Sequence, residues 1–427
     1  MLNVLVIHDL GDLSRARRTS VLHATFLQRY QPQHNYLFHD CRDPVTPALR
    51  AIRFHAVLFD VTFLCWRWVR PRARFEQLRE RYAYLAETDA VRAAFPQDEY
   101  DEGETLDAWL ADYRTDVVYT VLPGAEELVF PRTRRRAKIF PALTGYVEDA
   151  DIPAVSRWAA PFAARQTDVF YRARNLPAYF GSHGQLKARL GIRCQEAARA
   201  LGERGRPLRL DVSTRPEDTL LGEDWLRALG GARYTLGSEG GSSVWDPRGE
   251  IRDRCDQYLR EQPQASFEEV VQRCLPGEDR QQAFSAISPR LFEAALTRTG
   301  QLLVEAPYLG ALQPQTHYLA LAPDLSNLEE VLEASRDDRG AEARIEATYA
   351  ALVEPDTFRY SRHAEEVMAE LGSRARGVRG SSPSTFEALK ATHRLLVREQ
   401  RARLDLERRA RRLVPAPLKQ ALRRLLR

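Results

Sequence analysis

The chain has 427 residues, which is long for a single hydrophobic core, so two domains are expected. Its composition is that of an ordinary globular protein, and no apolar run reaches the ~18 residues that a transmembrane helix needs. The net charge of +4 is uneven: residues 401–427 hold ten basic and two acidic residues, a net +8, which leaves −4 for the rest. A mildly acidic body argues against binding to nucleic acid.

The start of the chain is a candidate strand, followed at once by His8 and Asp9, and it lacks the basic start and long apolar core of a signal peptide. The five cysteines are scattered, and no two have metal-ligand spacing, so reduced thiols and a cytoplasmic location are expected.

The first part of the chain alternates apolar runs with amphipathic segments. We expect strands at residues 2–7, 56–61, 117–122 and within 138–147, and helices at 19–30, 72–87, 105–113 and 152–164. Strands that alternate with helices predict a parallel sheet in an α/β domain.

The same alternation then starts again. We expect strands at residues 167–172, 207–212, 232–236, 301–304 and near 317–320, with helices at 185–205, 224–229, 289–299, 327–334 and 341–352. Two successive units of this kind predict two Rossmann-like doubly wound domains that face each other across a cleft, with the boundary near residue 165. The expected domains are 1–165 and 166–371, and 372–427 form a linker and C-terminal helices.

One helix start in the second unit combines an anion site with a hydroxyl acceptor. Ser288 suits the N-cap position and Pro289 the first helical position. Arg290 and Glu293 are three residues apart and share a face. Free N–H groups, the helix dipole and an arginine attract phosphate, and a glutamate suits sugar hydroxyls. The motif therefore predicts a site for a sugar nucleotide, and an exposed ion pair is the alternative.

Residues 287–305 resemble the C-terminal donor domain of GT-B glycosyltransferases, in the family-1-like and spore-coat-protein-like branch. An arginine-x-x-glutamate helix, a small residue and an apolar strand follow one another in that family as they do here. The resemblance implies Arg290 near the donor phosphates and Glu293 on the donor ribose. The fuller family pattern has two glutamates eight residues apart, but residue 285 is serine, so the sugar-facing glutamate is absent or supplied elsewhere.

A glycine-rich segment, residues 237–243, follows a strand of the second unit. Gly240 and Gly241 would let backbone N–H groups approach a phosphate, and Ser242 could donate a hydrogen bond. Glu239 is our candidate for the missing sugar contact. A flexible surface turn is the alternative. Arg172, at the end of the first strand of this unit, is a further phosphate candidate, with a solvated loop arginine as the alternative.

Two aspartates of the first unit are candidates for the general base. Asp9 follows the first strand, where Rossmann-like folds place functional groups, although capping of a strand end is the alternative. Asp98 lies in a Gln-Asp-Glu-Tyr segment that resembles a segment of the same glycosyltransferase branch. Asp149 and Asp151 form an Asp-x-Asp triplet, but acids before a helix need no metal. We therefore expect neither a metal nor another cofactor.

Residues 408–427 predict a basic amphipathic helix, which could bind an anionic membrane surface or pack on the body. Together these features predict a glycosyltransferase of hexosyltransferase type, which moves a sugar from a nucleotide donor to a glycan or lipid-linked acceptor in bacterial surface polysaccharide synthesis. The location would be cytoplasmic or on the inner face of the membrane. A GT-B-fold sugar-nucleotide epimerase and a non-catalytic coat or scaffold protein remain as alternatives. A NAD-type oxidoreductase is disfavoured, because no G-x-G-x-x-G follows the first strand.

Overall fold

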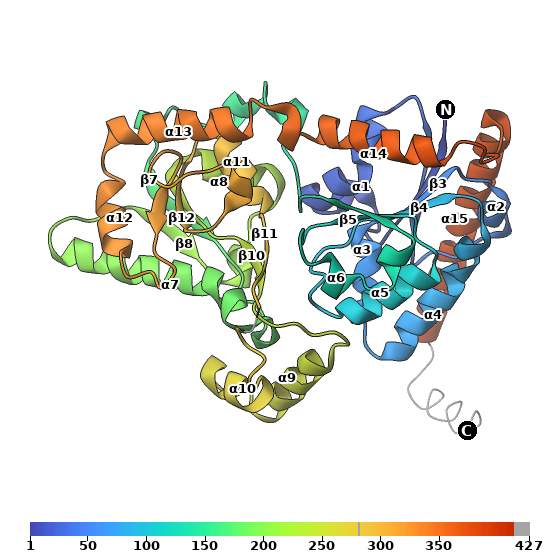
Figure 1. Ribbon diagram of the computed structural model, residues 1–427, viewed down its shortest axis with the longest axis horizontal. Coiled ribbons are helices and arrows are strands. Elements are labelled where there is room, and N and C mark those ends of the chain that lie inside the picture. The colour runs from blue at the N-terminus through green and yellow to red at the C-terminus, as the bar shows by residue number, and fades with distance from the viewer. Residues whose placement is uncertain (281, 414–427) are drawn as a thin grey trace.

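The computed structural model describes residues 1–280 and 282–413, which form two domains that lie side by side (Figure 1). The first domain contains a six-stranded sheet of order β2-β1-β3-β4-β5-β6, in which all neighbouring strands are parallel. The strands are β1 (Asn3–His8), β2 (Asn35–Asp40), β3 (Ala56–Phe59), β4 (Val91–Ala94), β5 (Val117–Thr120) and β6 (Lys138–Pro141). Every residue of β1 is buried, as expected for an apolar strand that helices cover on both faces.

Alternate residues of β1 contribute to cores on opposite faces of this sheet. Val6 packs with Phe26 of α1 on one face, and Leu5 belongs to the core that contains Trp109 of α5 on the other. The rings of Trp109 and Phe63 are 4.9 Å apart between centroids. The helices within residues 1–141 are α1 (Arg18–Tyr30), α2 (Pro47–Ala51), α3 (Val61–Leu64), α4 (Arg72–Tyr82), α5 (Gly103–Asp112) and α6 (Glu126–Val129).

The second domain contains a five-stranded parallel sheet of order β13-β12-β9-β7-β8. Its strands are β7 (Thr167–Arg172), β8 (Leu210–Ser213), β9 (Ala232–Gly237), β12 (Gly300–Val304) and β13 (Leu319–Leu321). Its helices are α7 (Gly181–Glu203), α8 (Gly222–Gly230), α11 (Pro289–Leu296), α12 (Leu328–Ala334) and α13 (Asp338–Leu352). The predicted fold class, α/β with two Rossmann-like doubly wound domains, is confirmed.

Some predicted elements differ from those observed. The helix expected at residues 152–164 is a series of single 3₁₀ turns, because Pro161 has no N–H group to continue a helix. The edge strand β2, which has polar residues at both ends, was not predicted. Nor was the antiparallel pair of β10 (Gly240–Ser242) and β11 (Phe284–Ala286). These short strands bring the glycine-rich segment against the chain that leads into α11.

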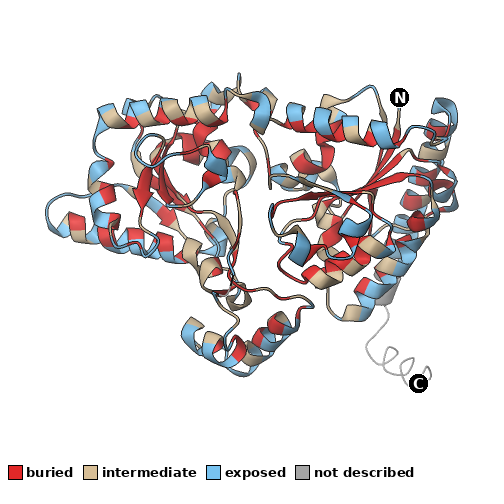
Figure 2. Cartoon of the chain, viewed as in Figure 1, coloured by how far each residue is buried: buried red, intermediate tan, exposed pale blue. Residues whose placement is uncertain are grey.

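The end of the chain returns to the first domain. α14 (Tyr360–Arg374) runs across the top of Figure 1 from α13, and its Val367 and Leu371 are fully buried with β1. α15 (Pro383–Leu413) packs on α2 and buries Phe386. α14 therefore packs on the first domain, although residues up to 371 were expected in the second. The sequence could not show this, because an apolar helix face does not specify which sheet it covers. Figure 2 shows buried residues concentrated on both sheets.

The basic amphipathic helix predicted at 408–427 lies outside the residues whose side chains the structure describes. Among the helices in the described ranges, none combines the length and the apolar character that crossing a lipid bilayer requires.

A helical insertion between β10 and β11 reaches the first domain (Figure 1). It contains α9 (Glu250–Glu261) and α10 (Phe267–Cys274). Arg252 of α9 forms an ion pair with Asp101 of the first domain, and both side chains are largely buried. Asp101 also forms a parallel bridge with Asp246. The insertion is therefore a further contact between the domains, besides the two chain crossings around residue 165 and between α13 and α14.

Candidate functional site

The start of α11 lies at a cavity. Ser288 occupies the N-cap position with extended backbone angles (φ −81°, ψ 140°), and Pro289 occupies the first helical position, as predicted. The Ser288 side chain makes no capping hydrogen bond, and Ser288, Pro289 and Arg290 line the cavity. Pro289 has no N–H group and the Leu291 amide donates to the Ser288 carbonyl oxygen, so the Arg290 amide is the first-turn donor available to an anion. This geometry can bind an anion at the helix N-terminus.

Arg290 and Glu293 share this cavity but do not form the ion pair that was the alternative. The indole Nε1 of Trp225 donates a hydrogen bond to Glu293 Oε2 at 2.7 Å. The Arg290 guanidinium lies over the Trp225 ring, 4.8 Å from its centroid, and donates to the carbonyl oxygen of Arg172. Burial raises the pKa of Glu293 above its ordinary value. Trp225 thus holds the cation and the carboxyl group apart, and both face the cavity.

Lys187 is a site residue that the sequence did not reveal. It lies on α7, and a Cβ atom at Gly240 would come within 2.9 Å of its Nζ, so the glycine makes room for the amine. Burial, followed by the Arg290 charge, lowers the pKa of Lys187 to about 8. In the described part of the chain, no carboxylate forms an ion pair with it. The chain has four lysines, and this scarcity is the one hint to Lys187 that the sequence contains.

The other residues of the glycine-rich segment have mainly structural contacts. Ser242 Oγ hydrogen bonds to the carbonyl oxygens of Phe180 and Val244, away from the cavity. A Cβ atom at Gly241 would lie 1.7 Å from the Phe284 carbonyl oxygen, so this glycine permits the β10–β11 pairing. Gly241 and Ser242 are therefore not in the position expected of phosphate ligands. Glu239 lies on the loop before β10 and accepts a hydrogen bond from the Tyr308 amide at 3.2 Å, so its sugar contact stays a prediction.

Arg172 lines the cavity, but its charge is largely compensated. Its guanidinium forms an ion pair with Asp211 at 2.6 Å and donates to the carbonyl oxygen of Asp218. Its own carbonyl oxygen accepts from Arg290. The side chain of Arg172 is thus engaged outside the cavity, and its contact with a phosphate stays a prediction.

The cavity has a volume of about 370 Å³ and is lined by both domains. Seven basic side chains and one acidic side chain face it: Arg17, Arg18, Arg172, Arg174, Lys187, Arg215, Arg290 and Glu293. The volume is in the range of small-molecule sites, and the charge selects for anions.

The predicted base Asp98 lies on a loop of the first domain and is not among the residues that line this cavity. Its negative charge raises the pKa of Lys187, but less than burial and the Arg290 charge lower it. The Tyr100 hydroxyl donates to Asp98 Oδ1 at 2.6 Å, and Arg67 donates to the Asp98 carbonyl oxygen at 2.9 Å. The backbone at Asp98 has φ +50°, a conformation that costs energy outside glycine. The loop thus holds this carboxylate in a fixed place beside the second domain.

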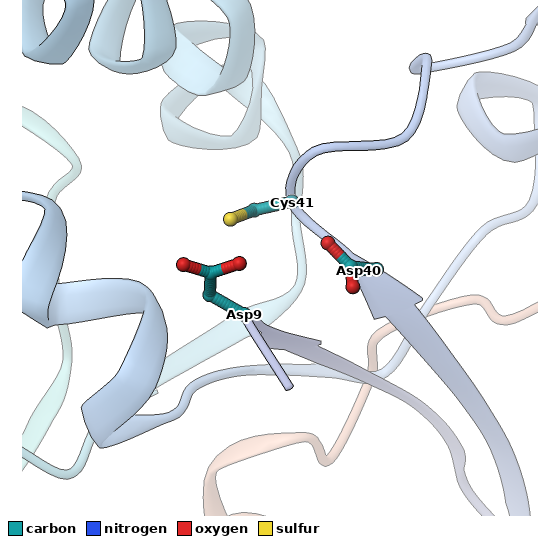
Figure 3. A group of neighbouring side chains, drawn as sticks. All are labelled: Asp9, Asp40 and Cys41. Carbon is teal, nitrogen blue, oxygen red and sulfur yellow. The ribbon is translucent and has the colours of Figure 1, made fainter. Parts of the chain in front are cut away.

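The other predicted base, Asp9, lies in a different cluster. Asp9 follows β1, and Asp40 and Cys41 end β2, so the three side chains converge (Figure 3). Arg42 forms ion pairs with Asp9 at 2.7 Å and with Asp40 at 2.6 Å, and it supplies the positive charge that the carboxylates require. The Trp66 indole N–H also donates to Asp9 at 3.1 Å. Asp9 is thus engaged by these partners, and its role as a base stays a prediction.

The two acids of the Asp-x-Asp triplet have separate partners. Asp151 forms an ion pair with Arg18 at 2.5 Å, and Asp149 accepts hydrogen bonds from the backbone amide and the hydroxyl of Ser361. Their carboxylates therefore serve contacts between segments.

Comparisons with known proteins bear on the fold. No protein-family model and no curated protein sequence matches the chain. An alpha-glucosyltransferase solved with UDP and a 13-mer DNA containing an HMU base has 8% identity and a TM-score of 0.50, over 87% of this chain and 99% of that one. The trehalose-6-phosphate synthase OtsA has 11% identity and a TM-score of 0.48 over 87% and 99%. Anabaena HepE in complex with UDP-glucose has 9% identity and a TM-score of 0.47 over 87% and 100%.

The similarity to the alpha-glucosyltransferase concerns the whole architecture, at an identity too low to carry residue roles. Together with the two parallel sheets and the cavity that both domains line, it shows that the chain has the GT-B fold.

Proposed function

We propose that this protein is a glycosyltransferase that binds a nucleoside-diphosphate sugar and transfers its sugar to an acceptor. The observation that carries the proposal is the position of Lys187 and Arg290. Both face one cavity at the N-terminus of α11, and the charge of Arg290 lowers the pKa of Lys187. Two like charges that share a cavity repel each other, and an anion that binds between them relieves this repulsion. A diphosphate supplies one negative charge per phosphate and fits this need.

The same groups account for the chemistry of transfer. Negative charge develops on the nucleoside diphosphate as the glycosidic bond breaks, and fixed donors that meet this charge stabilise the transition state. Lys187, the Arg290 side chain and the Arg290 amide would supply these donors. Glu293, held by the Trp225 indole, would accept hydrogen bonds from the ribose hydroxyls. Asp98 would remove the proton of the acceptor hydroxyl if the reaction inverts the anomeric centre.

The finer predictions are part of this proposal. They are the hexosyl donor, the glycan or lipid-linked acceptor of surface polysaccharide synthesis, a membrane-surface contact through residues 408–427, and a cytoplasmic location. A GT-B-fold epimerase would use the same donor groups, but it would release a sugar or an epimer without any acceptor. A coat or scaffold protein would bind no nucleotide at millimolar concentration.

A thermal-shift screen tests the donor site. UDP-, GDP-, dTDP- and CMP-linked sugars are added to the wild type and to Lys187→Gln, Arg290→Ala and Glu293→Ala. UDP is the first choice, because the alpha-glucosyltransferase of similar fold was solved with it. We expect the sugars of one nucleotide class to raise the Tm of the wild type. Lys138→Gln is a matched control whose lysine is 57% exposed, and its Tm should rise equally. The three site variants should lose most of the shift. A nucleotide that stabilises all variants equally would refute the site.

A further inference from the structure

The cavity holds more positive charge than a diphosphate can balance. Three of its seven basic side chains have carboxylate partners: Arg18 with Asp151 at 2.5 Å, Arg172 with Asp211 at 2.6 Å, and Arg215 with Asp218 at 2.7 Å. The other four, within the described ranges, form no ion pair: Arg17, Arg174, Lys187 and Arg290. Glu293 is the one acid of the lining, so the cavity keeps an excess of positive charge.

Two of these cations remain after the donor is accounted for. Lys187 and Arg290 match the two phosphates of a nucleoside-diphosphate sugar. Arg17 and Arg174 are then left without a counter-charge in the same cavity. A phosphate monoester carries about −1.5 to −2 charges at neutral pH, which two guanidinium groups can balance.

The two arginines come from opposite domains. Arg17 occupies the N-cap position of the 13-residue helix α1 in the first domain. Arg174 follows β7 in the second domain. An anion that both contact would lie between the domains, and the acceptor must enter there to reach the sugar.

We propose that the acceptor of this glycosyltransferase carries a phosphate group, which Arg17 and Arg174 bind. The inference rests on the proposed function and adds the substrate class on the acceptor side. Arginine suits this task because its guanidinium donates two parallel hydrogen bonds to phosphate oxygens. Such a phosphate can belong to a soluble sugar phosphate or to a lipid phosphate, and the same pair of arginines would recognise either.

The test compares the wild type, Arg17→Gln/Arg174→Gln and the control Arg15→Gln, an exposed arginine that does not line the cavity. Calorimetry first measures the Kd of the nucleoside diphosphate that the thermal-shift screen identifies. With that nucleotide saturating, inorganic phosphate, glucose 6-phosphate and glucose are titrated at constant ionic strength. A second arm measures co-sedimentation with phosphatidylcholine vesicles that contain or lack a polyprenyl phosphate.

We expect the double variant to keep the wild-type nucleotide Kd within twofold. The wild type and Arg15→Gln should bind a phosphate probe at least tenfold more tightly than its neutral counterpart, and the double variant should lose this preference. Preference for glucose 6-phosphate would identify a soluble acceptor, and preference for polyprenyl phosphate vesicles a lipid acceptor. Two results would overturn the inference and leave the proposed function intact: an unchanged preference in the double variant, or a tenfold loss of its nucleotide affinity. A wild type that binds no nucleotide would overturn both.

Discussion

The charge of Lys187 makes donor affinity depend on pH in a defined direction. Burial and Arg290 lower its pKa from 10.5 to about 8 in the free protein. A bound diphosphate would stabilise the charged amine and raise this pKa again. We therefore expect the donor to bind the protein in which Lys187 is protonated. This form predominates below pH 8 and is lost as the pH rises above it. Near pH 9 about one amine in ten is still charged, so the Kd should rise roughly tenfold between pH 7 and pH 9.

Calorimetry in two buffers of different ionisation enthalpy measures both the affinity and the protons taken up. We expect nearly one proton to be bound per nucleotide at pH 9 and almost none at pH 7. Lys187→Gln should bind weakly at both pH values, with no proton uptake. A wild-type Kd that stays constant from pH 7 to pH 9.5 would show that Lys187 does not contact the donor.

The same lowered pKa implies a cost to the free protein. The unfolded chain binds a proton at Lys187 up to pH 10.5, whereas the folded chain releases it near pH 8. Stability therefore increases as the pH rises from 8 to 10.5, and below pH 8 the charged amine destabilises the fold by roughly 3 kcal/mol. Lys187→Met should raise the Tm of the nucleotide-free protein at pH 7 while it abolishes the shift that the donor causes. A lower Tm for this variant would contradict the argument.

Three further substitutions probe the rest of the molecule. Asp98→Asn should lower kcat about 100- to 10,000-fold with an unchanged donor Kd if Asp98 is the base, as initial rates and calorimetry would show. Asp101→Ala leaves the largely buried Arg252 without its partner and should cost about 3–5 kcal/mol in urea unfolding, with Asp101→Leu/Arg252→Met costing less. Gly241→Ala would place a Cβ atom 1.7 Å from the Phe284 carbonyl oxygen, and its Tm should correspond to a loss on the order of 3 kcal/mol.

Much of the fold could be predicted because β1, β3, β5, β7, β9 and β12 are apolar runs that sheets bury. The start of α11 was predictable for a similar reason, since Ser288 and Pro289 mark a helix start within a few residues. The sheet on which α14 packs was not predictable, because periodicity identifies an apolar face but not the element that covers it. The placement of Gly241 and Ser242 was wrong because their backbone pairs with β11, more than 40 residues later in the chain.

Lys187 shows why the site itself was only partly predictable. A lone lysine in a helix has no local signature, and its role depends on three distant segments. Gly240 makes room for its amine, Arg290 lowers its pKa, and Asp98 from the other domain raises it. Each contact is set by tertiary structure, so the start of α11 could be found from spacing while Lys187 could not.

The distribution of charge around the cavity also separates the alternative functions. An epimerase needs acid or base groups at the sugar but no site for an acceptor, and a scaffold needs neither. Here the first domain contributes Arg17 and Arg18 to the cavity lining, and Arg18 is paired with Asp151. Arg17 has no such partner in the described part of the chain and faces the cavity from the side opposite Lys187 and Arg290. A cation in that position suits a second substrate that enters between the domains, and this arrangement favours transfer over epimerisation.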